Sequence, residues 1–386
     1  QAEQKGTGHA VLVTREMLAP DGGRVMVLYG DSPLLEAATL RRLADRQHSA
    51  DHAAALITTT LEDPTGYGRI LLDDRGEVSR IVEQRAATPA QLAIKLANPG
   101  IYCFRADLLW KHIGELEPDN PSRELYLTDM VEIFRRHGYS TGALHVDDSN
   151  QLLGINTRVE LAAADRIFRE RKVRELMLAG VTIEKPETVT IDAPVSIGCD
   201  TIVEPFTQIL GATTIGEDCR IGAGAILRDS EIADGVDIGA FTLIAASRVE
   251  TGAHVGPFAR LRQDNRVEAG ARIGNFVELK KTRLGAGAKA MHLAYLGDAE
   301  IGAGVNIGAG TITCNYDGVR KHTTKIGARA FVGSNSTLVA PVEVGEESYV
   351  GAGSVITDPV PAKALALGRG RQVIKEGWAG SRKKKS

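Results

Sequence analysis

An aliphatic residue recurs every six positions through most of the second half of this chain. Three stretches keep the spacing, and their aliphatic residues are Ile191, Ile197, Val203, Ile209, Ile215, Ile221 and Leu227, then Val249, Val255, Leu261, Val267, Ile273 and Leu279, then Ile326, Val332, Leu338, Val344, Val350 and Ile356. A Gly, Ala or other small residue lies beside most of them. A fixed short period indicates one structural unit stacked many times, and this period is typical of a hexapeptide parallel β-helix. Each hexad then supplies one short strand and one turn, and the aliphatic side chains stack inside the coils.

Residues 1 to about 155 have a different pattern, in which apolar runs alternate with helical spacing. Strands are expected at residues 24–29, 53–61, 69–72, 78–84 and 101–104, and helices at 35–47, 106–116 and 123–137. The turn residues Asp73-Asp74-Arg75-Gly76 predict a hairpin between the third and fourth of these strands. Strands that alternate with helices indicate an open α/β sheet.

A long charged helix is expected between the two halves. Thr157-Arg158-Val159-Glu160 fits a capping box, and Gly180 is a plausible stop. The sequence therefore divides into an α/β domain at 1–156, a helical linker at 157–180, a β-helix at 181–368 and a basic tail at 369–386. The six-residue spacing is interrupted from Cys314 to Lys325, and insertions in solenoids form loops on one face, often the binding face.

Composition excludes several classes of protein. The net charge is −3, which argues against a general nucleic-acid binder. No apolar run is long enough to span a membrane. The four cysteines are scattered without a CxxC pair, which indicates a reduced cytoplasmic protein without a structural zinc site.

Polar residues concentrate in one part of the β-helix. Arg262 and Lys280 are 18 residues apart, which is one triangular coil of three hexads, so the two cations are expected to stack. Stacked cations suit an anionic group such as a phosphate, although a solvated basic face would have the same spacing. His292 follows them and is a candidate general base, or an ordinary surface histidine. Asn315-Tyr316 in the interrupting segment suit either hydrogen bonding to a ligand or a turn.

In the α/β half, Asp31 follows the apolar run at 24–29. Open α/β sheets bind ligands at the carboxyl ends of their strands, so Asp31 is a candidate ligand-binding residue. The same residue would also suit a turn, and Gly66-Tyr67-Gly68 would also suit a plain loop.

Long motifs in both halves resemble one bacterial family. They are residues 256–262 (GPFARLR), 274–281 (GNFVELKK), 292–299 (HLAYLGDA), 306–318 (NIGAGTITCNYDG), 1–10 (QAEQKGTGHA), 28–31 (LYGD), 65–70 (TGYGRI), 81–84 (IVEQ) and 154–158 (GINTR). Over nearly the whole chain the sequence resembles the bifunctional N-acetylglucosamine-1-phosphate uridylyltransferase/glucosamine-1-phosphate N-acetyltransferase family. One departure is Gln263, where the family typically carries Pro after Arg262.

The resemblance implies a Rossmann-like nucleotidyltransferase domain followed by a left-handed β-helix that forms a homotrimer, with acetyl sites between neighbouring subunits. It implies acetyl transfer from acetyl-CoA to glucosamine 1-phosphate. Uridylyl transfer from UTP then gives UDP-N-acetylglucosamine for cell-wall and lipopolysaccharide precursors. A second interpretation is a sugar-1-phosphate nucleotidyltransferase with a non-catalytic β-helix. A third, a zinc hydratase, finds no ligand set in the spacing of His254, His292 and His322.

Roles in the β-helix follow from the resemblance. His292 would accept the proton of the sugar amine, and Glu278 would orient a cation or His292. The glucosamine 1-phosphate site would consist of Arg262, Lys280, Tyr295 and Asn306. The acetyl-CoA site would consist of Ala309, Asn315, Tyr316, Ser334, Ala352 and Arg369. The charge of the basic tail, by itself, would suit a nucleic-acid or membrane patch, but a solvated tail or one that favours the phosphates of CoA is the preferred interpretation.

Roles in the α/β domain follow in the same way. Asp31 and Asn156 would bind Mg²⁺, which suits a site of few protein oxygens completed by phosphate and water. The residues that would contact the nucleotide sugar are Gln1, Gly6 and Thr7 at the uracil, Tyr29 and Gly30 beside the metal, and Gly68, Glu83, Asn98 and Asn156 at the sugar.

The family's Gly-rich Leu-Ala-Ala-Gly loop, which wraps the triphosphate, does not occur in the sequence. The chain begins at Gln1 without Met. A preceding segment of at least one βαβ unit, roughly 30 residues, is therefore expected. The chain as given is expected not to transfer UMP.

Overall fold

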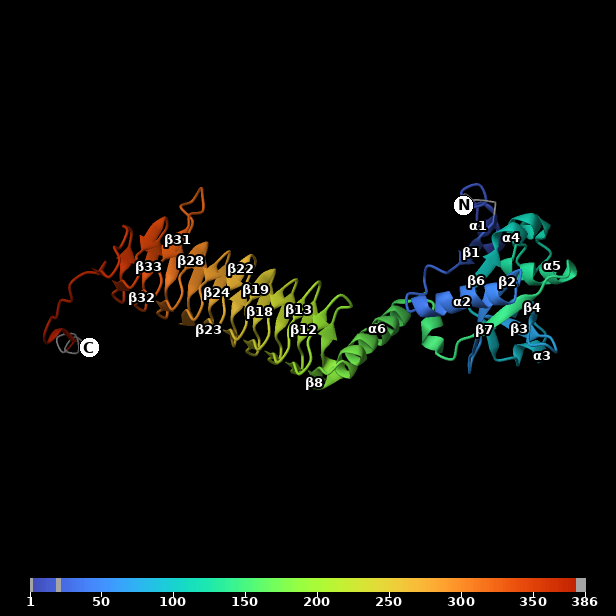
Figure 1. Ribbon diagram of the computed structural model, residues 1–386, viewed down its shortest axis with the longest axis horizontal. Helices are drawn as coiled ribbons and strands as arrows, with labels where there is room; N and C mark the ends of the chain where they lie inside the picture. The colour runs from blue at the N-terminus through green and yellow to red at the C-terminus, as the bar shows by residue number, and fades with distance from the viewer. Residues whose placement is uncertain (1–2, 19–21, 380–386) are drawn as a thin grey trace, which may run out of the picture. The chain divides into compact units, whose positions relative to one another are not determined.

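The computed structural model describes residues 3–18 and 22–379 (Figure 1). The chain divides into two compact units, residues 1–168 and 169–386. The division falls within helix α6 (Arg158–Leu178), which is the charged helix that the sequence predicts.

The first unit is a seven-stranded sheet with helices. Its strands are β1 (Arg24–Val27), β2 (Ala54–Thr60), β3 (Gly68–Leu72), β4 (Val78–Val82), β5 (Leu96–Asn98), β6 (Tyr102–Arg105) and β7 (Thr141–His145). Its α-helices are α1 (Thr7–Leu12), α2 (Ala37–Ser49), α3 (Pro89–Leu92), α4 (Ala106–His112) and α5 (Met130–Arg136). Its 3₁₀ turns are η1 (Gln84–Ala86), η2 (Ile113–Glu115), η3 (Leu127–Asp129) and η4 (Ser149–Leu152).

The strand order is β1-β6-β2-β5-β3-β4, with β7 on β2. β7 runs parallel to β2, whereas the other described pairs are antiparallel. The predicted hairpin is confirmed as β3–β4. The α/β class is therefore confirmed, although the described part of the sheet is mostly antiparallel.

The helix predicted at 123–137 is shorter in the structure and begins at Met130. Asn120 explains the difference, because its side-chain oxygen accepts from the amides of Ser122 and Glu124 and its amide donates to the Glu124 carbonyl. Such local side-chain bonds offer the backbone an alternative to a helix.

The predicted capping box at the start of α6 is confirmed. The Thr157 hydroxyl accepts from the Glu160 amide, and the Glu160 carboxylate accepts from the amides of Asn156 and Thr157. Gly180 follows the helix with a φ of 96°, a left-handed conformation that suits a helix stop.

The second unit is a parallel β-helix with three faces, each a sheet of short stacked strands. Its first turn includes the 3₁₀ segment η5 (Pro186–Thr188). Face 1 consists of β8 (Thr182–Ile183), β11 (Ile202–Val203), β14 (Arg220–Ile221), β17 (Asp237–Ile238), β20 (His254–Val255), β23 (Arg272–Asn275), β26 (Lys289–His292), β29 (Asn306–Ile307), β32 (Phe331–Val332), β35 (Tyr349–Val350) and β37 (Leu365–Ala366). Face 2 consists of β9 (Thr190–Ile191), β12 (Gln208–Leu210), β15 (Ile226–Arg228), β18 (Leu243–Ala245), β21 (Arg260–Leu261), β24 (Glu278–Lys280), β27 (Tyr295–Gly297), β30 (Ile312–Cys314), β33 (Thr337–Val339) and β36 (Val355–Ile356). Face 3 consists of β10 (Ser196–Ile197), β13 (Thr214–Ile215), β16 (Glu231–Ile232), β19 (Ser247–Val249), β22 (Asn265–Val267), β25 (Arg283–Leu284), β28 (Ala299–Ile301), β31 (Thr324–Ile326) and β34 (Val342–Val344).

The aliphatic residues of the three predicted stretches are all buried, with exposed fractions of 8% or less. The stretches lose register with one another because some turns between face 2 and face 3 are one residue shorter. Leu279 is followed after five residues by Leu284, and their strands still pair with the coils above and below. The edge between faces 2 and 3 is therefore the edge whose length varies.

The interrupting segment also lies at this edge, between β30 and β31. It leaves the stacked strands as a projecting loop (Figure 1). Tyr316 and Lys321 form an antiparallel bridge across it, and Asp317 accepts from the amides of Val319 and Arg320 at its tip. The expected loop is confirmed.

All four cysteines are free. Among the helices that the structure describes, none has both the length and the apolar character needed to cross a membrane.

Candidate functional site

In the first unit, a cavity of about 470 Å³ opens at the ends of several strands. Predicted site residues that line it are Tyr29, Asp31, Gly68, Glu83, Asn98 and Asn156. Gly30 lies between two of them in the chain. Thus a predicted set from five separate segments of sequence meets at one cavity.

Packing fixes two of the cavity side chains. The Tyr29 ring lies over Gly100, where a Cβ would be 2.1 Å from the ring, so a side chain at Gly100 would displace the tyrosine. The Asn98 amide donates to the Tyr102 hydroxyl and its oxygen accepts from the Gly100 amide. Burial raises the pKa of Tyr29, with the nearby Glu83 and Asp31 as further causes.

Glu83 connects this cavity to the predicted uracil segment. The Thr128 hydroxyl donates to the Glu83 carboxylate at 3.1 Å, and the neighbouring Leu127 amide donates to the Thr7 hydroxyl at 3.0 Å. Burial raises the pKa of Glu83, and the Thr128 hydrogen bond opposes the rise. Gly6 precedes Thr7 with a φ of 100°, and a Cβ at Gly6 would be 2.6 Å from the Leu125 carbonyl oxygen. Gln1 lies outside the described residues.

The cavity also carries oxygen donors of the kind that Mg²⁺ prefers. Asp31 and Asn156 both line it, and the Asp31 carboxylate lies against Gly154, two residues before Asn156. The Ile155 amide donates to the Asp31 backbone carbonyl at 2.9 Å, which holds these two segments together. A carboxylate and an amide oxygen are hard ligands that fit Mg²⁺.

In the β-helix, the first cluster lies at the edge between faces 2 and 3. The strand register Leu261↔Leu279 places Arg262 beside Lys280, so the two cations occupy neighbouring coils as predicted. Their side chains pair with different carboxylates. Arg262 lies 3.3 Å from Glu278, whereas Lys280 lies 3.3 Å from Asp298.

Lys280 is 5% exposed and belongs to a buried network. Asp298 also accepts from the Asn315 side-chain amide, which ties the projecting loop to this edge. Lys321 of the loop lies near Lys280, and a hydrogen bond between the two amines, which requires one of them to be neutral, raises the pKa of Lys280, with Asp298 as a further cause. The same contact lowers the pKa of Lys321.

Tyr295 lies on face 2 one coil above Glu278. Its hydroxyl end lies over Gly297, where a Cβ would be 2.5 Å from the hydroxyl oxygen and 2.9 Å from the Asn315 amide nitrogen. Tyr295 and Asn315 are therefore neighbours of Lys280. Tyr316 is 59% exposed, and its hydroxyl donates to the Gly318 carbonyl.

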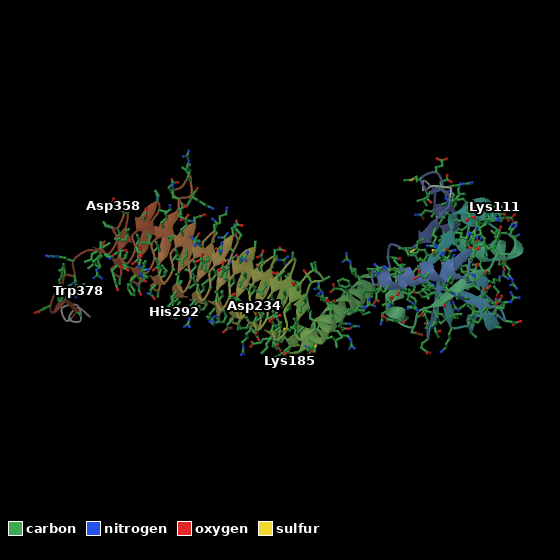
Figure 2. All side chains as sticks on the ribbon, in the orientation of Figure 1. Lys111, Lys185, Asp234, His292, Asp358 and Trp378 are labelled. Carbon is green, nitrogen blue, oxygen red and sulfur yellow. The ribbon has the colours of Figure 1, made fainter. Side chains whose placement is uncertain are left out.

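His292 lies at the edge between faces 1 and 2, exposed at the surface of the β-helix (Figure 2). Its Nδ1 is 2.7 Å from the Asn275 side-chain oxygen, one coil below. With that oxygen as acceptor, Nδ1 carries the proton and Nε2 carries the lone pair. A neutral imidazole held this way can accept a proton at Nε2.

Four predicted residues form one column along the His292 edge. The strand register of face 1 pairs Ala290 with Ile307, Ile307 with Val332, and Val332 with Val350. The residues two positions further along the chain therefore lie one above another, and they are His292, Ala309, Ser334 and Ala352. Arg369 completes the column, because its guanidinium donates to the Ala352 carbonyl at 2.8 Å. The column covers three coil spacings of about 4.8 Å each before Arg369.

The residues that occupy the left-handed turn positions of this edge differ below and above His292. Below it, left-handed turn positions carry Phe241, Phe258 and Phe276, whose rings stack at 5.3 and 5.5 Å, followed by Leu293. Above it, the corresponding left-handed positions are Gly310, Asn335 and Gly353. Their backbone amides donate to the coil below, to the carbonyls of Leu293, Ala309 and Ser334 respectively. The left-handed positions beside Ala309, Ser334 and Ala352 therefore carry only glycine or asparagine.

One chain does not bring all of the predicted β-helix residues together. Asn306 begins strand β29 on the outside of face 1, whereas Tyr295 and Lys280 lie on face 2 and its far edge. His292 lies on the edge between these faces. Face 1 and face 2 point in different directions around that edge.

The sequence did not single out several residues that the structure places at these sites. They are Thr128 and Glu160 at the cavity, Asn275 beside His292, and Asp298 and Lys321 beside Lys280. Asn275 and His292 are 17 residues apart, which is the length of one coil with a shortened turn. That spacing could have predicted that the two side chains are neighbours. The others lie together only through tertiary packing.

Comparisons with known proteins agree across both units. The nucleotidyl transferase family profile matches residues 1–150, the profile of bacterial transferase hexapeptide (six repeats) matches 194–229, and the hexapeptide repeat of succinyl-transferase matches 323–358. A bifunctional protein GlmU from Solibacter usitatus is 62% identical over 384 residues, covering 100% of this chain and 82% of the relative. Proteins of the same name from Koribacter versatilis and Pelobacter propionicus are 51% and 47% identical, covering 98% and 100% of this chain and 81% and 84% of the relatives.

Proposed function

This chain belongs to the bifunctional GlmU family, which joins an acetyltransferase and a uridylyltransferase in one polypeptide, and we propose the residues that carry each reaction. The chain is a bifunctional transferase of UDP-N-acetylglucosamine synthesis. The observation that carries the residue assignment is the column that begins at His292 and ends at Arg369.

In the acetyl transfer, we assign His292 as the general base. When the amine of glucosamine 1-phosphate attacks the acetyl-CoA thioester, its nitrogen becomes positively charged and must lose a proton. The lone pair on Nε2 of His292 can accept that proton. Asn275 positions the ring by accepting from Nδ1. The fixed tautomer means that the ring need not reorganise during the reaction.

Acetyl-CoA lies, in this proposal, along the column of Ala309, Ser334 and Ala352, with Arg369 beside it. Small side chains leave room for an extended pantetheine arm against the backbone, and Arg369 supplies a positive charge for the CoA phosphates. The Asn315 and Tyr316 segment would lie near the reacting groups, with an amide that can donate to the developing oxyanion.

Arg262 and Lys280 would hold the sugar phosphate, with Tyr295 and Asn306 completing the sugar site. Because Asn306 faces out from face 1 and Lys280 lies at the far edge of face 2, the site requires faces from two subunits. This supports a homotrimer through the β-helix with sites between neighbours.

In the uridylyl transfer, Asp31 and Asn156 would hold Mg²⁺, which supplies charge neutralisation for the UTP phosphates. Gly68, Glu83 and Asn98 would bind the sugar. Gly6 and Thr7 would contact the uracil, and Tyr29 with Gly30 would flank the metal. The protein's task in such a reaction is mostly to position the two substrates.

Free cysteines support a reducing compartment, and we infer that the protein acts in the cytoplasm.

A complementation experiment tests the shared site. Arg262→Ala and Asn306→Ala chains, carrying different tags, are expected to have acetyltransferase activities reduced at least about tenfold, since each loses a polar contact to glucosamine 1-phosphate. When the two are co-expressed and mixed trimers purified through both tags, one of the three interfaces in each mixed trimer combines two intact halves, so activity should rise toward about a third of wild type. Mixed trimers that stay as inactive as the parents would place the site within one chain, and an unimpaired Asn306→Ala variant would remove Asn306 from it.

A further inference from the structure

A cluster of three metal-ligating side chains lies in the α/β unit, away from the nucleotide cavity. His112 Nδ1 is 2.6 Å from one Glu115 oxygen, and His137 Nε2 is 3.0 Å from the other. One ligand atom from each of the three residues lies within 4.8 Å of the other two. Two imidazoles that converge on a single carboxylate are more than an ordinary ion pair requires.

The protein scaffold holds these ligands in place. His112 is the last residue of α4, Glu115 ends the following turn η2, and His137 comes directly after α5. His112 is 3% exposed, its ring lies edge-on to Phe134 with centroids 6.3 Å apart, and it lies 4.1 Å from the His137 ring. Core packing therefore fixes the buried ligand before any ion arrives, which is what a preorganised site needs.

The donor set selects a particular kind of ion. Two imidazole nitrogens and one carboxylate oxygen suit Zn²⁺ and similar divalent transition metals, whereas Mg²⁺ prefers oxygen ligands. Bonds of about 2.0–2.2 Å in a tetrahedron place ligand atoms roughly 3.3–3.6 Å apart. The observed 2.6 and 3.0 Å separations need only small outward shifts to reach that geometry.

The cluster also has an open side. Glu115 lines a cavity of about 630 Å³ whose wall carries both further carboxylates and arginines, namely Glu117, Asp119, Asp129, Glu132, Arg80, Arg135 and Arg136. Glu115 and His137 side chains are 39% and 42% exposed, so an ion and a coordinating water have access from solvent. No residue that lines this cavity also lines the nucleotide cavity.

We propose that His112, Glu115 and His137 form a binding site for one Zn²⁺-type metal ion per chain. The ion would join the end of α4 and η2 to the end of α5. Metal binding then stabilises the α/β unit, because the folded chain presents the three ligands together and the unfolded chain does not.

The test uses the full chain after removal of metals with a chelator. Zn²⁺ binding is measured by titration calorimetry, and Co²⁺ is used as a spectroscopic probe, because its visible bands report tetrahedral coordination. His137→Gln and Glu115→Gln are the test variants, and both positions are exposed enough to keep the fold. His145→Gln is the matched control, since His145 is a similarly exposed histidine of the same unit that also faces a carboxylate, Asp147, at 3.5 Å.

We expect one Zn²⁺ per chain for the wild type and the control, and a higher melting temperature of the α/β unit with metal. Loss of an outer-sphere partner lowers metal affinity roughly 10–100-fold. Each test variant loses a direct ligand, so its affinity for Zn²⁺ should fall by more than that. Mg²⁺ in excess should not compete. No Zn²⁺ binding by the wild type would overturn the proposal. Equal binding by the test variants and His145→Gln would also overturn it, and would assign the bound ion to other groups such as Cys199.

Discussion

Removal of the Lys280 charge should destabilise the β-helix strongly, because the lysine pairs with a carboxylate in a nearly buried setting. The Lys280 and Asp298 side chains are 7% and 15% exposed and lie 3.3 Å apart. Loss of one partner of a buried pair costs about 3–5 kcal/mol, because the other charge stays uncompensated. The Asn315 amide and Lys321 still face Asp298 in a Lys280→Met variant. We therefore expect a loss near the lower end, about 3 kcal/mol.

The measurement is urea unfolding, which leaves ion pairs unscreened, followed by far-ultraviolet circular dichroism at fixed protein concentration, which reports the secondary structure of both units. Lys281→Met is the matched control, because Lys281 is the next residue, is 51% exposed and lies 4.0 Å from Asp264. Its loss should stay within about 0.5 kcal/mol. The double variant Lys280→Met/Asp298→Asn removes both charges and should recover most of the loss.

The pH dependence has a definite sign. The pKa of Lys280 is raised in the folded chain, first by its hydrogen bond with Lys321 and then by Asp298. A raised pKa gives stability that is fully present below the ordinary lysine value and is lost as pH rises through the folded value. The deficit of Lys280→Met should therefore be equal at pH 7 and 9. A variant as stable as Lys281→Met, or a deficit that vanishes between those pH values, would refute the buried pair as a stabilising contact.

Changes at three further positions have expected outcomes. Asn275→Ala should lower kcat of acetyl transfer about tenfold, because one tautomer-fixing hydrogen bond is lost, while the KM for acetyl-CoA stays constant. Ala352→Trp should raise the KM for acetyl-CoA at least tenfold with little change in that for glucosamine 1-phosphate, and equal effects on both would remove the column from the CoA path. Burial, aided by Glu132, raises the pKa of Asp129 to about 6, so ionisation above that pH opposes folding. Asp129→Asn should therefore raise the melting temperature at pH 7.5 but not at pH 4. An equal change of melting temperature at both pH values would contradict the raised pKa.

The β-helix could be predicted from the sequence because its core is a one-dimensional pattern. Each inward aliphatic residue, such as Leu261 or Val332, repeats at the spacing of one strand and one turn, so local order alone specifies the fold. The shifts of register were harder, since a five-residue turn such as Leu279 to Leu284 looks like a break in the pattern. Only the strand pairing shows that the stack continues through it.

The α/β unit was less predictable. The Asn120 side chain replaces the first turns of the expected helix at 123–137, and such competition between side-chain and backbone hydrogen bonds has no periodic signal. The antiparallel pairing of β6 with β1 and β2 depends on contacts between distant segments. Alternation of strands and helices predicts the class but not the order of the sheet.

The candidate site shows the same limit. Motifs identified His292, Lys280 and Asp31, because residues that carry chemistry lie in recognisable runs. The partners Asn275 and Asp298 follow from the coil register, which the sequence gives only to within one residue. Lys321 reaches Lys280 through the fold of the projecting loop, which no spacing predicts.

The central claim is that His292 is the general base of an acetyltransferase in the β-helix. Free-thiol release from acetyl-CoA on addition of glucosamine 1-phosphate tests it most directly, with wild type, His292→Ala and the partly exposed control His254→Ala measured side by side. The account predicts that His292→Ala lowers kcat by about 10²–10⁴-fold with little change in the KM of either substrate, while His254→Ala retains activity. A His292→Ala enzyme within a few-fold of wild type, folded and of the same oligomeric state, would contradict it.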